Sequence, residues 1–303
     1  MSSNVNSLDF SAVTDLTGRV ALVTGGGTGI GLMIAKGLAS NGATVYVGGR
    51  RVDVLEEATH LRFGKENEKR IIALQLDVTD KSSILSAVDT MSKAHAKLDI
   101  LINNAGHLGP RTAFTTTPDA PERASCATYG RAQFDSQSFE DWGSHFALNI
   151  GSTFFVTNAF LGLLEASTKS TRSGEDKQWA SVINITSAVS SFTLSHGYFA
   201  YVSSKAALGH LTKVMANDLA MKGMPIRINA ISPGVFPSEL TASKEFLDKN
   251  ASDPGTALRP SPMLRPGREH EIAALAVYMA SPASNFMMGH EVLLDGGLSL
   301  VNP

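Results

Sequence analysis

The sequence has little of several features that commonly reveal a function: cysteine, net charge and long apolar runs. Its 303 residues include one cysteine, Cys126, which cannot form an intramolecular disulfide and has no neighbours at zinc-binding spacing. We therefore interpret Cys126 as an ordinary thiol and expect a reducing compartment. The formal net charge of -2 gives no reason to expect nucleic acid or an anionic membrane surface as a partner.

Signals for secretion and for membrane insertion are also missing. Residues 1–13 contain neither a basic segment nor a long apolar run, and no later stretch reaches the roughly 18 apolar residues of a membrane span. Residues 184–186 match a glycosylation triplet inside an apolar, strand-like run, and we interpret that match as chance. These absences predict a cytoplasmic protein without a membrane partner. We also expect no metal, because His270 and Glu271 lack the partner of a zinc-binding helix motif.

The chain does have a regular alternation of two kinds of segment. Hydrophobic residues make up 43% of it and neither a linker nor a repeat divides it, so residues 1–303 are expected to form one domain. Short β-rich runs alternate with longer amphipathic runs, which predicts an α/β fold: a doubly wound parallel sheet of seven strands with helices on both faces. The expected strands are 19–25, 44–49, 71–78, 98–106, 179–187, 226–232 and 290–297. The expected helices are 31–42, 52–61, 81–97, 141–166, 201–223 and 268–281.

A glycine-rich turn, TGGGTGIG at Thr24–Gly31, follows the first expected strand and opens the first expected helix. Gly25 would allow a tight turn, and Gly29 and Gly31 would allow a pyrophosphate and the sheet to approach the helix closely. Free N–H groups at the helix N-terminus would bind the phosphates. The alternative, a flexible turn without a ligand, is disfavoured by the strand and the helix on either side.

Three motifs together resemble those of the short-chain dehydrogenase/reductase family. They are T-G-x-x-x-G-x-G in the glycine turn, NNAG at Asn103–Gly106 and the pair Tyr201-x-x-x-Lys205. They occur in the family's order, and the resemblance covers residues 17–297. It implies a Rossmann-like domain that binds a nicotinamide dinucleotide at the carboxyl ends of its strands.

The stretch YFAYVSSK holds two tyrosines, and one of them stands four residues before the lysine. Tyr201 and Lys205 share one face of a helix, where a phenol and an ammonium can act on the same ligand, whereas Tyr198 would project elsewhere. The resemblance makes Tyr201 and Lys205 catalytic. The alternative for Tyr201 is an aromatic side chain packed in the core.

By resemblance, Ser187 and Asn149 complete the catalytic set. Ser187 follows the fifth expected strand at the family's serine position, although Thr186, Ser190 and Ser191 stand nearby. Asn149 lies inside an otherwise apolar helix, where a buried amide needs a partner. In the family this asparagine supports a helix distortion and a water that relays protons to the lysine. A hydrogen-bonded core asparagine is the alternative.

These side chains suit the reduction of a carbonyl group. The developing alkoxide needs one hydrogen-bond donor and one acid, which we assign to Ser187 and Tyr201. A phenol exchanges protons poorly at neutral pH, so we expect the adjacent Lys205 cation to lower the pKa of Tyr201. By resemblance, Lys205 also binds the ribose next to the nicotinamide.

The end of the second expected strand, VYVGGRR, indicates NADP(H) as the cofactor. An acid there would bind the ribose 2′-hydroxyl of NAD, but Gly48 and Gly49 stand in its place, and the Arg50 guanidinium that follows suits a phosphate. Asp53 is expected to cap a helix, and Arg51 either joins Arg50 or points to solvent. With the residues that the resemblance adds, the expected cofactor site consists of Gly25, Thr28, Gly29, Ile30, Gly31, Arg50, Arg51, Asp77, Val78, Asn103, Ala105, Gly106, Tyr201, Lys205, Pro233, Gly234 and Val235.

Two segments depart from the family's usual pattern. Residues 107–138 make a longer connection than usual, which predicts an inserted loop, either a lid or a surface excursion. Residues 234–267 stand where the family carries its substrate loop. The apolar residues of this second loop either face the substrate or pack onto their own domain; they are Phe236, Leu240, Phe246, Leu247 and Met263.

The sequence thus predicts an NADPH-dependent ketoreductase. Residues 17–51, 159–166 and 233–241 look most like relatives of 3-oxoacyl-carrier-protein reductases tied to rhamnolipid or polyketide metabolism, which implies a β-ketoacyl or polyketide-derived ketone as substrate. An acyl carrier protein that holds this substrate would meet the arginines of the inserted loop: Arg111, Arg123 and Arg131.

The sequence also allows other functions. The same fold serves NAD(P)-dependent secondary-alcohol dehydrogenases, non-redox enzymes and nucleotide-sensing proteins. Family habit implies a homotetramer or homodimer built on the helices around 142–166 and 201–221. The apolar residues of those helices can equally be buried within one subunit.

Overall fold

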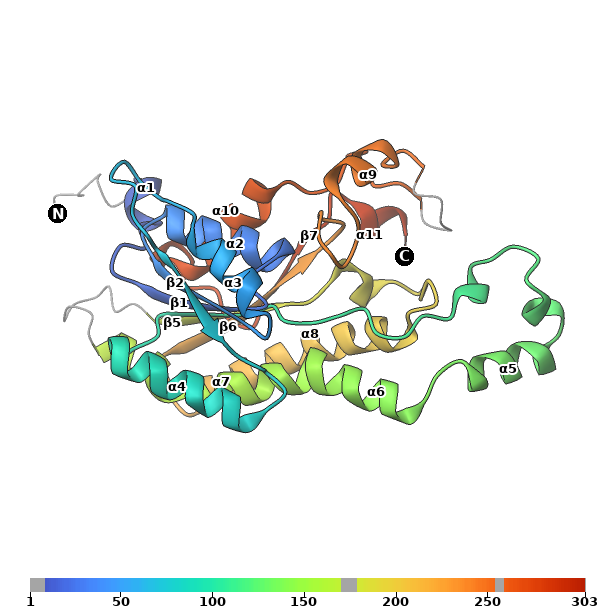
Figure 1. Ribbon diagram of the computed structural model, residues 1–303, viewed down its shortest axis with the longest axis horizontal. Helices are drawn as coiled ribbons and strands as arrows, with labels where there is room; N and C mark the ends of the chain where they lie inside the picture. The colour runs from blue at the N-terminus through green and yellow to red at the C-terminus, as the bar shows by residue number, and fades with distance from the viewer. Residues whose placement is uncertain (1–8, 170–178, 254–258, 303) are drawn as a thin grey trace.

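The computed structural model describes residues 9–169, 179–253 and 259–302, with a parallel sheet at its centre (Figure 1). The seven strands are hydrogen-bonded in the order β3-β2-β1-β4-β5-β6-β7, and every pair is parallel. The strands are β1 Val20–Thr24, β2 Thr44–Gly49, β3 Ile71–Gln75, β4 Ile100–Asn103, β5 Ala180–Ile185, β6 Ile226–Pro233 and β7 Glu291–Leu294. The predicted doubly wound Rossmann-like sheet is confirmed.

Helices cover both faces of this sheet. α2, α3 and α10 lie on one face, and α4, α7 and α8 lie on the other (Figure 1). A π-helical turn, Ala147–Gly151, joins α6 to α7. The helices are α1 Phe10–Val13, α2 Gly29–Ser40, α3 Val52–Thr59, α4 Lys81–His95, α5 Cys126–Asp135, α6 Phe139–Phe146, α7 Ser152–Lys169, α8 Phe199–Met221, α9 Lys244–Lys249, α10 Glu269–Ala280 and α11 Leu298–Val301.

The two helical layers create two separate hydrophobic cores. On β1, Ala21 and Val23 join the core beneath α2 and α10, whereas Val20 and Leu22 join the core beneath α4, α7 and α8. Because side chains alternate between the two faces of a strand, a strand covered by helices on both faces can bury apolar side chains on each face. This explains the apolar run Val20–Val23 of β1.

The helical segment Phe139–Lys169 is the one described helix that is long and apolar enough, by length and composition alone, to cross a membrane. This differs from the expectation that no segment would reach that length. Its side chains Val156, Phe160 and Leu164 are fully buried in the core beneath the sheet. The packing accounts for the apolar composition, as in the core helix of any α/β domain.

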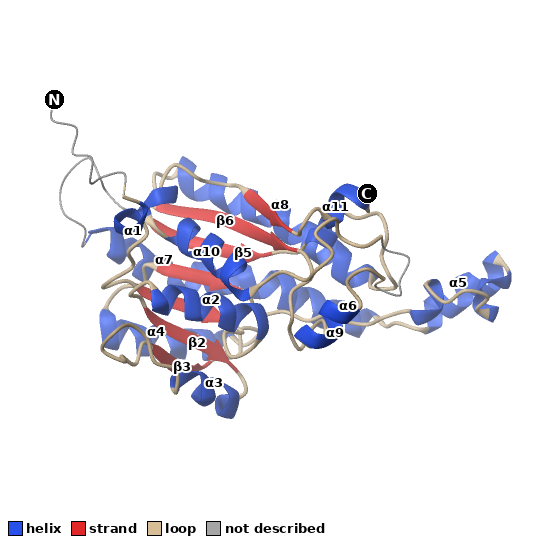
Figure 2. Ribbon diagram, turned by 90° about the horizontal axis from the view of Figure 1, so that it is seen from above, coloured by secondary structure: helices blue, strands red, loops and turns tan. Residues whose placement is uncertain are grey.

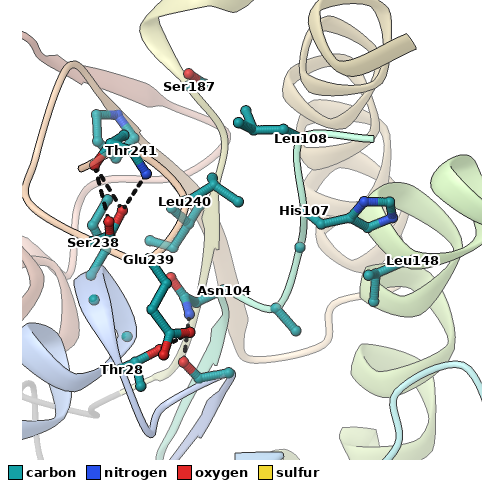
Figure 3. A pocket seen from close by; sticks show the side chains of 18 of the residues that line it. Thr28, Asn104, His107, Leu108, Leu148, Ser187, Ser238, Glu239, Leu240 and Thr241 are labelled. Atoms are coloured by element: carbon teal, nitrogen blue, oxygen red, sulfur yellow. Dashed lines mark hydrogen bonds between the residues drawn. The ribbon is translucent and has the colours of Figure 1, made fainter. Parts of the chain in front are cut away.

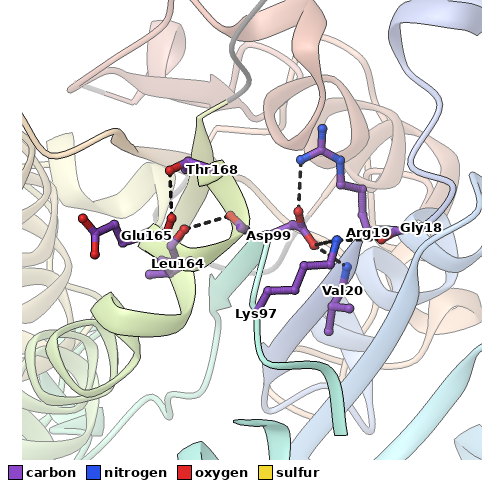
Figure 4. Close-up of polar contacts among 9 residues, drawn as sticks. Gly18, Arg19, Val20, Lys97, Asp99, Leu164, Glu165 and Thr168 are labelled. Atoms are coloured by element: carbon purple, nitrogen blue, oxygen red, sulfur yellow. Dashed lines mark hydrogen bonds and ion pairs between the residues drawn. The ribbon is translucent and has the colours of Figure 1, made fainter. Parts of the chain in front are cut away.

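A buried carboxylate connects β1 to β4 at the amino end of the sheet (Figure 4). Asp99 is 2% exposed, and its Oδ2 accepts a hydrogen bond from the backbone N–H of Val20 at 2.9 Å. Arg19 Nη1 and Lys97 Nζ lie 3.1 and 3.0 Å from its oxygens. Two cations and a backbone donor compensate for the loss of water around this charge.

At the opposite end, the order of the strands reverses beside β1. The chain runs from β1 outward through β2 and β3, and then returns to β4 on the other side of β1. In such sheets the crevice beyond the carboxyl ends of the strands, at the point of reversal, is the place where ligands bind. The glycine turn after β1 and the NNAG turn after β4 meet there.

Residues 107–138 do not form a simple loop. They contain α5, which extends away from the body of the molecule (Figure 2). Ser125 caps this helix by accepting a hydrogen bond from the backbone N–H of Thr128 at 3.1 Å, yet the helix buries no residue. The sequence prediction missed it because a helix without a buried face has no apolar periodicity. The predicted substrate segment, 234–267, contains α9, and its residues 254–258 lie outside the described part of the chain.

Candidate active site

A pocket of about 460 Å³ lies at the carboxyl ends of the strands (Figure 3). Sixteen of the seventeen residues predicted for the cofactor site line it; Asn103 does not. Of the predicted catalytic residues, Ser187, Tyr201 and Lys205 line it, and Asn149 lies behind its wall. Within the described residues, no three His, Cys, Asp or Glu side chains are grouped so that they could hold a metal ion.

At Gly31 the glycine turn is packed too closely for any side chain. A Cβ on Gly31 would lie 2.2 Å from the carbonyl oxygen of Gly25, so a side chain there would force the turn apart. The turn is connected to β4 through Thr24, whose Oγ1 accepts hydrogen bonds from the backbone N–H groups of Asn104 and Ala105 at 3.0 and 3.1 Å. These contacts join the end of β1 to the turn after β4. The N-terminus of α2 lines the pocket, where its N–H groups can bind an anion.

Of the two asparagines of the NNAG turn, Asn103 was predicted to line the cofactor site, but Asn104 is the one that lines the pocket. The Asn103 amide is 5% exposed and donates hydrogen bonds to Thr157 Oγ1 and Asn184 Oδ1, both at 2.9 Å, so it belongs to a polar network inside the core. Asn104 lines the pocket and donates to the carbonyl oxygen of Gly25 at 3.0 Å. Strand alternation explains the difference, because adjacent residues point to opposite sides.

The end of β2 brings Arg50 and Arg51 to the pocket, and Gly48 and Gly49 line it without any acid. Arg50 forms none of the ion pairs found among the described residues. Arg51 lines the pocket and is solvent-exposed, and its Nη2 lies 2.7 Å from Glu239 Oε2 of the substrate segment. Asp53 was expected to cap α3, but Arg51 holds the N-cap position and Asp53 lies in the first helical turn.

Tyr201 and Lys205 lie one turn apart on α8 and are both buried, with 9% and 5% of their surface exposed. Lys205 Nζ donates a hydrogen bond to the carbonyl oxygen of Ile185 at 2.7 Å and lies 5.8 Å from the centre of the Tyr201 ring. Tyr198 is outside the pocket, with the Arg111 guanidinium 5.5 Å from its ring centre. The geometry therefore selects Tyr201 over Tyr198.

The electrostatics of this pair differ from the expectation. Burial raises the pKa of Tyr201, and a hydrogen bond with Ser187 acts in the opposite direction with a smaller effect. Burial also lowers the pKa of Lys205 to about 8. The Lys205 cation was expected to lower the pKa of Tyr201, but in this geometry desolvation is the larger influence on both groups.

Ser187 is distinguished from its neighbours by what they contact. Thr186 Oγ1 is hydrogen-bonded to the carbonyl oxygen of Ile231 and to Glu291, and Ser191 Oγ donates to the carbonyl oxygen of Ala188. Ser190 and Ser191 do not line the pocket. Of these four hydroxyls, Ser187 is the one that both lines the pocket and is hydrogen-bonded with Tyr201.

Asn149 lies in the π-helical turn, where the resemblance had predicted a helix distortion. Its Oδ1 accepts a hydrogen bond from the backbone N–H of His107, and its Nδ2 donates to the carbonyl oxygen of the same residue, both at 3.1 Å. The amide is thus paired with the backbone of the segment that follows NNAG. A π-turn of this kind often occurs at functional sites.

Sequence reasoning missed His145, which lies one turn before Asn149. It is fully buried, and its Nε2 lies 3.1 Å from both Ser204 Oγ and Asn149 Nδ2. Burial, with smaller contributions from His107 and Lys205, lowers the pKa of His145 to about 4, so it is neutral at physiological pH. Its position four residues before Asn149 was the available signal.

Apolar side chains also line the pocket. Of the five apolar residues predicted for the substrate segment, Phe236 and Leu240 line the pocket; Phe246, Leu247 and Met263 do not. The apolar lining residues that sequence reasoning did not predict include Leu108, Val189, Phe192 and Leu298.

Comparison with known proteins agrees with this geometry. The model of the short chain dehydrogenase family matches residues 19–247. The short-chain dehydrogenase/reductase PhomF of Diaporthe leptostromiformis is 35% identical over 100% of this chain and 99% of its own. The rhamnolipids biosynthesis 3-oxoacyl-(acyl-carrier-protein) reductase of Pseudomonas aeruginosa is 33% identical over 94% of this chain and 98% of its own.

A solved structure, the Pseudomonas aeruginosa RhlG/NADP active-site complex, superposes with a TM-score of 0.72 at 30% identity and covers 95% of this chain and 98% of that one. The family match, the relatives over nearly the full length and the pocket geometry agree. The protein is an oxidoreductase that belongs to the short-chain dehydrogenase/reductase family.

Proposed function

We propose that this protein is an NADPH-dependent ketoreductase acting on a β-ketoacyl or polyketide-derived ketone. One observation carries the proposal: Tyr201 and Ser187 face the same end of a pocket whose other end holds the glycine turn and Arg50. An acid and a hydrogen-bond donor at one point are what the oxygen of a carbonyl needs while it gains charge.

The residues present fit NADP(H). The glycine turn and the N-terminus of α2 line the pocket, where free N–H groups would bind a pyrophosphate. Gly31 lets α2 approach the turn closely, because a Cβ there would lie 2.2 Å from the carbonyl oxygen of Gly25. Arg50 faces the pocket at the end of β2, and Gly48 and Gly49 replace the acid that would favour NAD. Asp77 and Val78 line the pocket at the place expected for the adenine.

When bound, the nicotinamide would supply the hydride that a ketone needs. The protein's own residues hold and protonate the oxygen: Ser187 donates a hydrogen bond to it, and Tyr201 delivers the proton. Lys205 holds the end of β5 through Ile185 and places a positive charge beside Tyr201. The charge favours loss of the Tyr201 proton at the moment of transfer.

The apolar wall supports a substrate with an acyl or polyketide chain. Leu108, Val189 and Phe192 line the pocket together with Ser187 and would exclude water from such a chain. The relative from Pseudomonas aeruginosa is named as a 3-oxoacyl reductase, which fits the same substrate class. We also propose that an acyl carrier protein carries the substrate. Residues 107–138 contain three arginines and three acids, so the segment has no net positive charge to attract an acidic carrier protein, and the arginines would have to bind it individually.

The decisive experiment follows oxidation of NADPH and NADH at 340 nm against a panel of ketones. The panel holds β-ketoacyl thioesters on coenzyme A and on acyl carrier protein, together with simple ketones. We expect turnover with NADPH that Tyr201→Phe abolishes and that Tyr198→Phe leaves intact, because only the first phenol faces the pocket. Turnover that survives in Tyr201→Phe, or nucleotide binding without turnover, contradicts the proposal and favours a non-redox or sensing role on this fold.

The same proposal includes a homotetramer or homodimer. Phe154 and Phe155 of α7 and Val214 and Met221 of α8 are between 43% and 79% exposed, which leaves apolar surface on the two helices that the family pairs between subunits. Light scattering on the purified protein gives the number of subunits, and a monomer at micromolar concentration would contradict this part. Cytoplasmic location remains a prediction.

A further inference from the structure

The substrate segment contacts the cofactor end of the pocket through Glu239. Glu239 stands 188 residues from Arg51 in sequence, yet Arg51 Nη1 donates to Oε1 at 3.2 Å and Nη2 donates to Oε2 at 2.7 Å. Thr28 Oγ1 also donates to Oε2, at 3.3 Å (Figure 3). The carboxylate is thus bound by a forked guanidinium and by the N-cap residue of α2.

These donors are the ones that an anionic ligand would use. A guanidinium binds a carboxylate and a phosphate with the same two-pronged geometry, and a helix N-terminus attracts either anion. Arg51 and Glu239 are each 59% exposed, so water and salt reach the pair and it can exchange partners. Glu239 therefore occupies an anion site from which it can be displaced.

Ser238, the residue before Glu239, packs against the glycine turn. Gly29 has a φ of +52°, and a Cβ there would lie 2.8 Å from Ser238 Cβ. The base of the segment is fixed, because Phe236 is 2% exposed and its carbonyl oxygen accepts from Thr241 Oγ1 at 2.5 Å. Residues 238–240 are thus the tip of a tight turn that covers the place expected for the phosphates.

We propose that Glu239 is a displaceable stand-in for the cofactor's phosphate, and that the 2′-phosphate of NADP(H) competes with it for Arg51. This inference rests on the proposed cofactor. A cofactor with a 2′-phosphate takes Arg51 away and releases the tip of the substrate segment, whereas a cofactor without that group leaves the pair intact. Glu239 thereby contributes to the choice of NADP(H) over NAD(H) and couples that choice to the segment that covers the substrate.

Calorimetric titration with 2′,5′-ADP, which carries the 2′-phosphate, and with 5′-ADP, which lacks it, tests this competition. We expect Glu239→Gln to tighten binding of 2′,5′-ADP about two- to fivefold, the size of an exposed ion pair, and to change binding of 5′-ADP less. In an Arg51→Gln background the same change should have no effect on 2′,5′-ADP. Glu245→Gln removes an exposed acid from the same segment and serves as the matched control.

The rate of trypsin cleavage in the substrate segment tests its release independently of nucleotide affinity. Trypsin can cut at Lys244 and Lys249, just beyond the tip, and 2′,5′-ADP should speed this cleavage in the wild type. In Glu239→Gln the cleavage should be fast without any nucleotide, and 2′,5′-ADP should change it no further.

Four outcomes contradict the inference or its foundation, and they can be told apart. Unchanged binding in Glu239→Gln overturns the competition, and weaker binding means that Glu239 clamps the bound cofactor. Cleavage that ignores both the nucleotide and the substitution overturns the release of the segment. A wild type that binds NADPH and 2′,5′-ADP no better than NADH and 5′-ADP refutes the proposed cofactor and the inference with it.

Discussion

Lys205 Nζ donates a hydrogen bond to the carbonyl oxygen of Ile185 across the junction of α8 and β5, at 2.7 Å. The contact holds the ammonium of Lys205 beside the strand that carries Ser187 two residues later. It also keeps the ammonium inside the protein, where burial lowers its pKa to about 8. Lys205 is therefore close to losing its charge under mildly alkaline conditions.

We predict a pH limit on activity from this group. The pKa of Lys205 is lowered, so its cation is present below about pH 8 and is lost as the pH rises through that value. Because kcat/KM reports the free enzyme, its pH profile should fall above about pH 8. Lys205→Arg keeps a cation at all these pH values, and its profile, at lower activity, should lack that limb. If kcat/KM of Lys205→Arg still falls above about pH 8, a group other than Lys205 causes the fall.

Ser187 should be needed for turnover and not for cofactor binding. Removing one preorganised donor to a developing oxyanion costs about 10²- to 10³-fold in kcat. We expect Ser187→Ala to lose activity on this scale while the Kd for NADPH changes little, as measured by nucleotide fluorescence. Ser190→Ala is the matched control, because that hydroxyl does not line the pocket. Equal losses in the two variants would refute the assignment.

Arg50 should determine the affinity for the 2′-phosphate. It faces the pocket and forms no ion pair with another described residue, so it is available to a ligand. A hydrogen bond to a charged group contributes about 1.5–3 kcal/mol, so Arg50→Gln should raise the KM for NADPH roughly 10- to 100-fold and leave that for NADH nearly unchanged. Arg62→Gln, an exposed arginine outside the pocket, should change neither constant.

His145 should make the protein less stable in acid. Its pKa falls from 6.5 to about 4 on folding, so the unfolded chain binds this proton more readily. Stability from this group is present above pH 6.5 and is lost as the pH falls toward 4, by about 2 kcal/mol at pH 5. His107 and Lys205, which face His145, act in the same direction. Urea unfolding at pH 7.5 and pH 5 measures the loss.

The variant His145→Gln should lose less stability between these two pH values than the wild type does. His210→Gln, which removes an exposed histidine from α8, should lose as much as the wild type. If His145→Gln follows the wild type at both pH values, another buried group takes up the proton.

Much of the fold and of the site could be predicted from local sequence. All seven strands and the six predicted helices are present, because apolar runs of strand length and amphipathic runs of helix length reflect burial on one or two faces. The glycine turn was predicted because its geometry depends on residues a few positions apart. The Tyr201–Lys205 pair was predicted from the family resemblance, which the four-residue spacing on a helix supports. Helix α5 was missed because it buries nothing.

The sequence by itself determined the doubly wound sheet and the residues that reach its carboxyl edge, since strand and helix periods and turn glycines are local properties. Only the tertiary structure decided which of those residues face the pocket. Asn104 replaces Asn103, His145 joins Asn149, and Glu239 meets Arg51. Such contacts form between segments brought together by packing, and burial in the packed site also determines the pKa values of Tyr201 and Lys205.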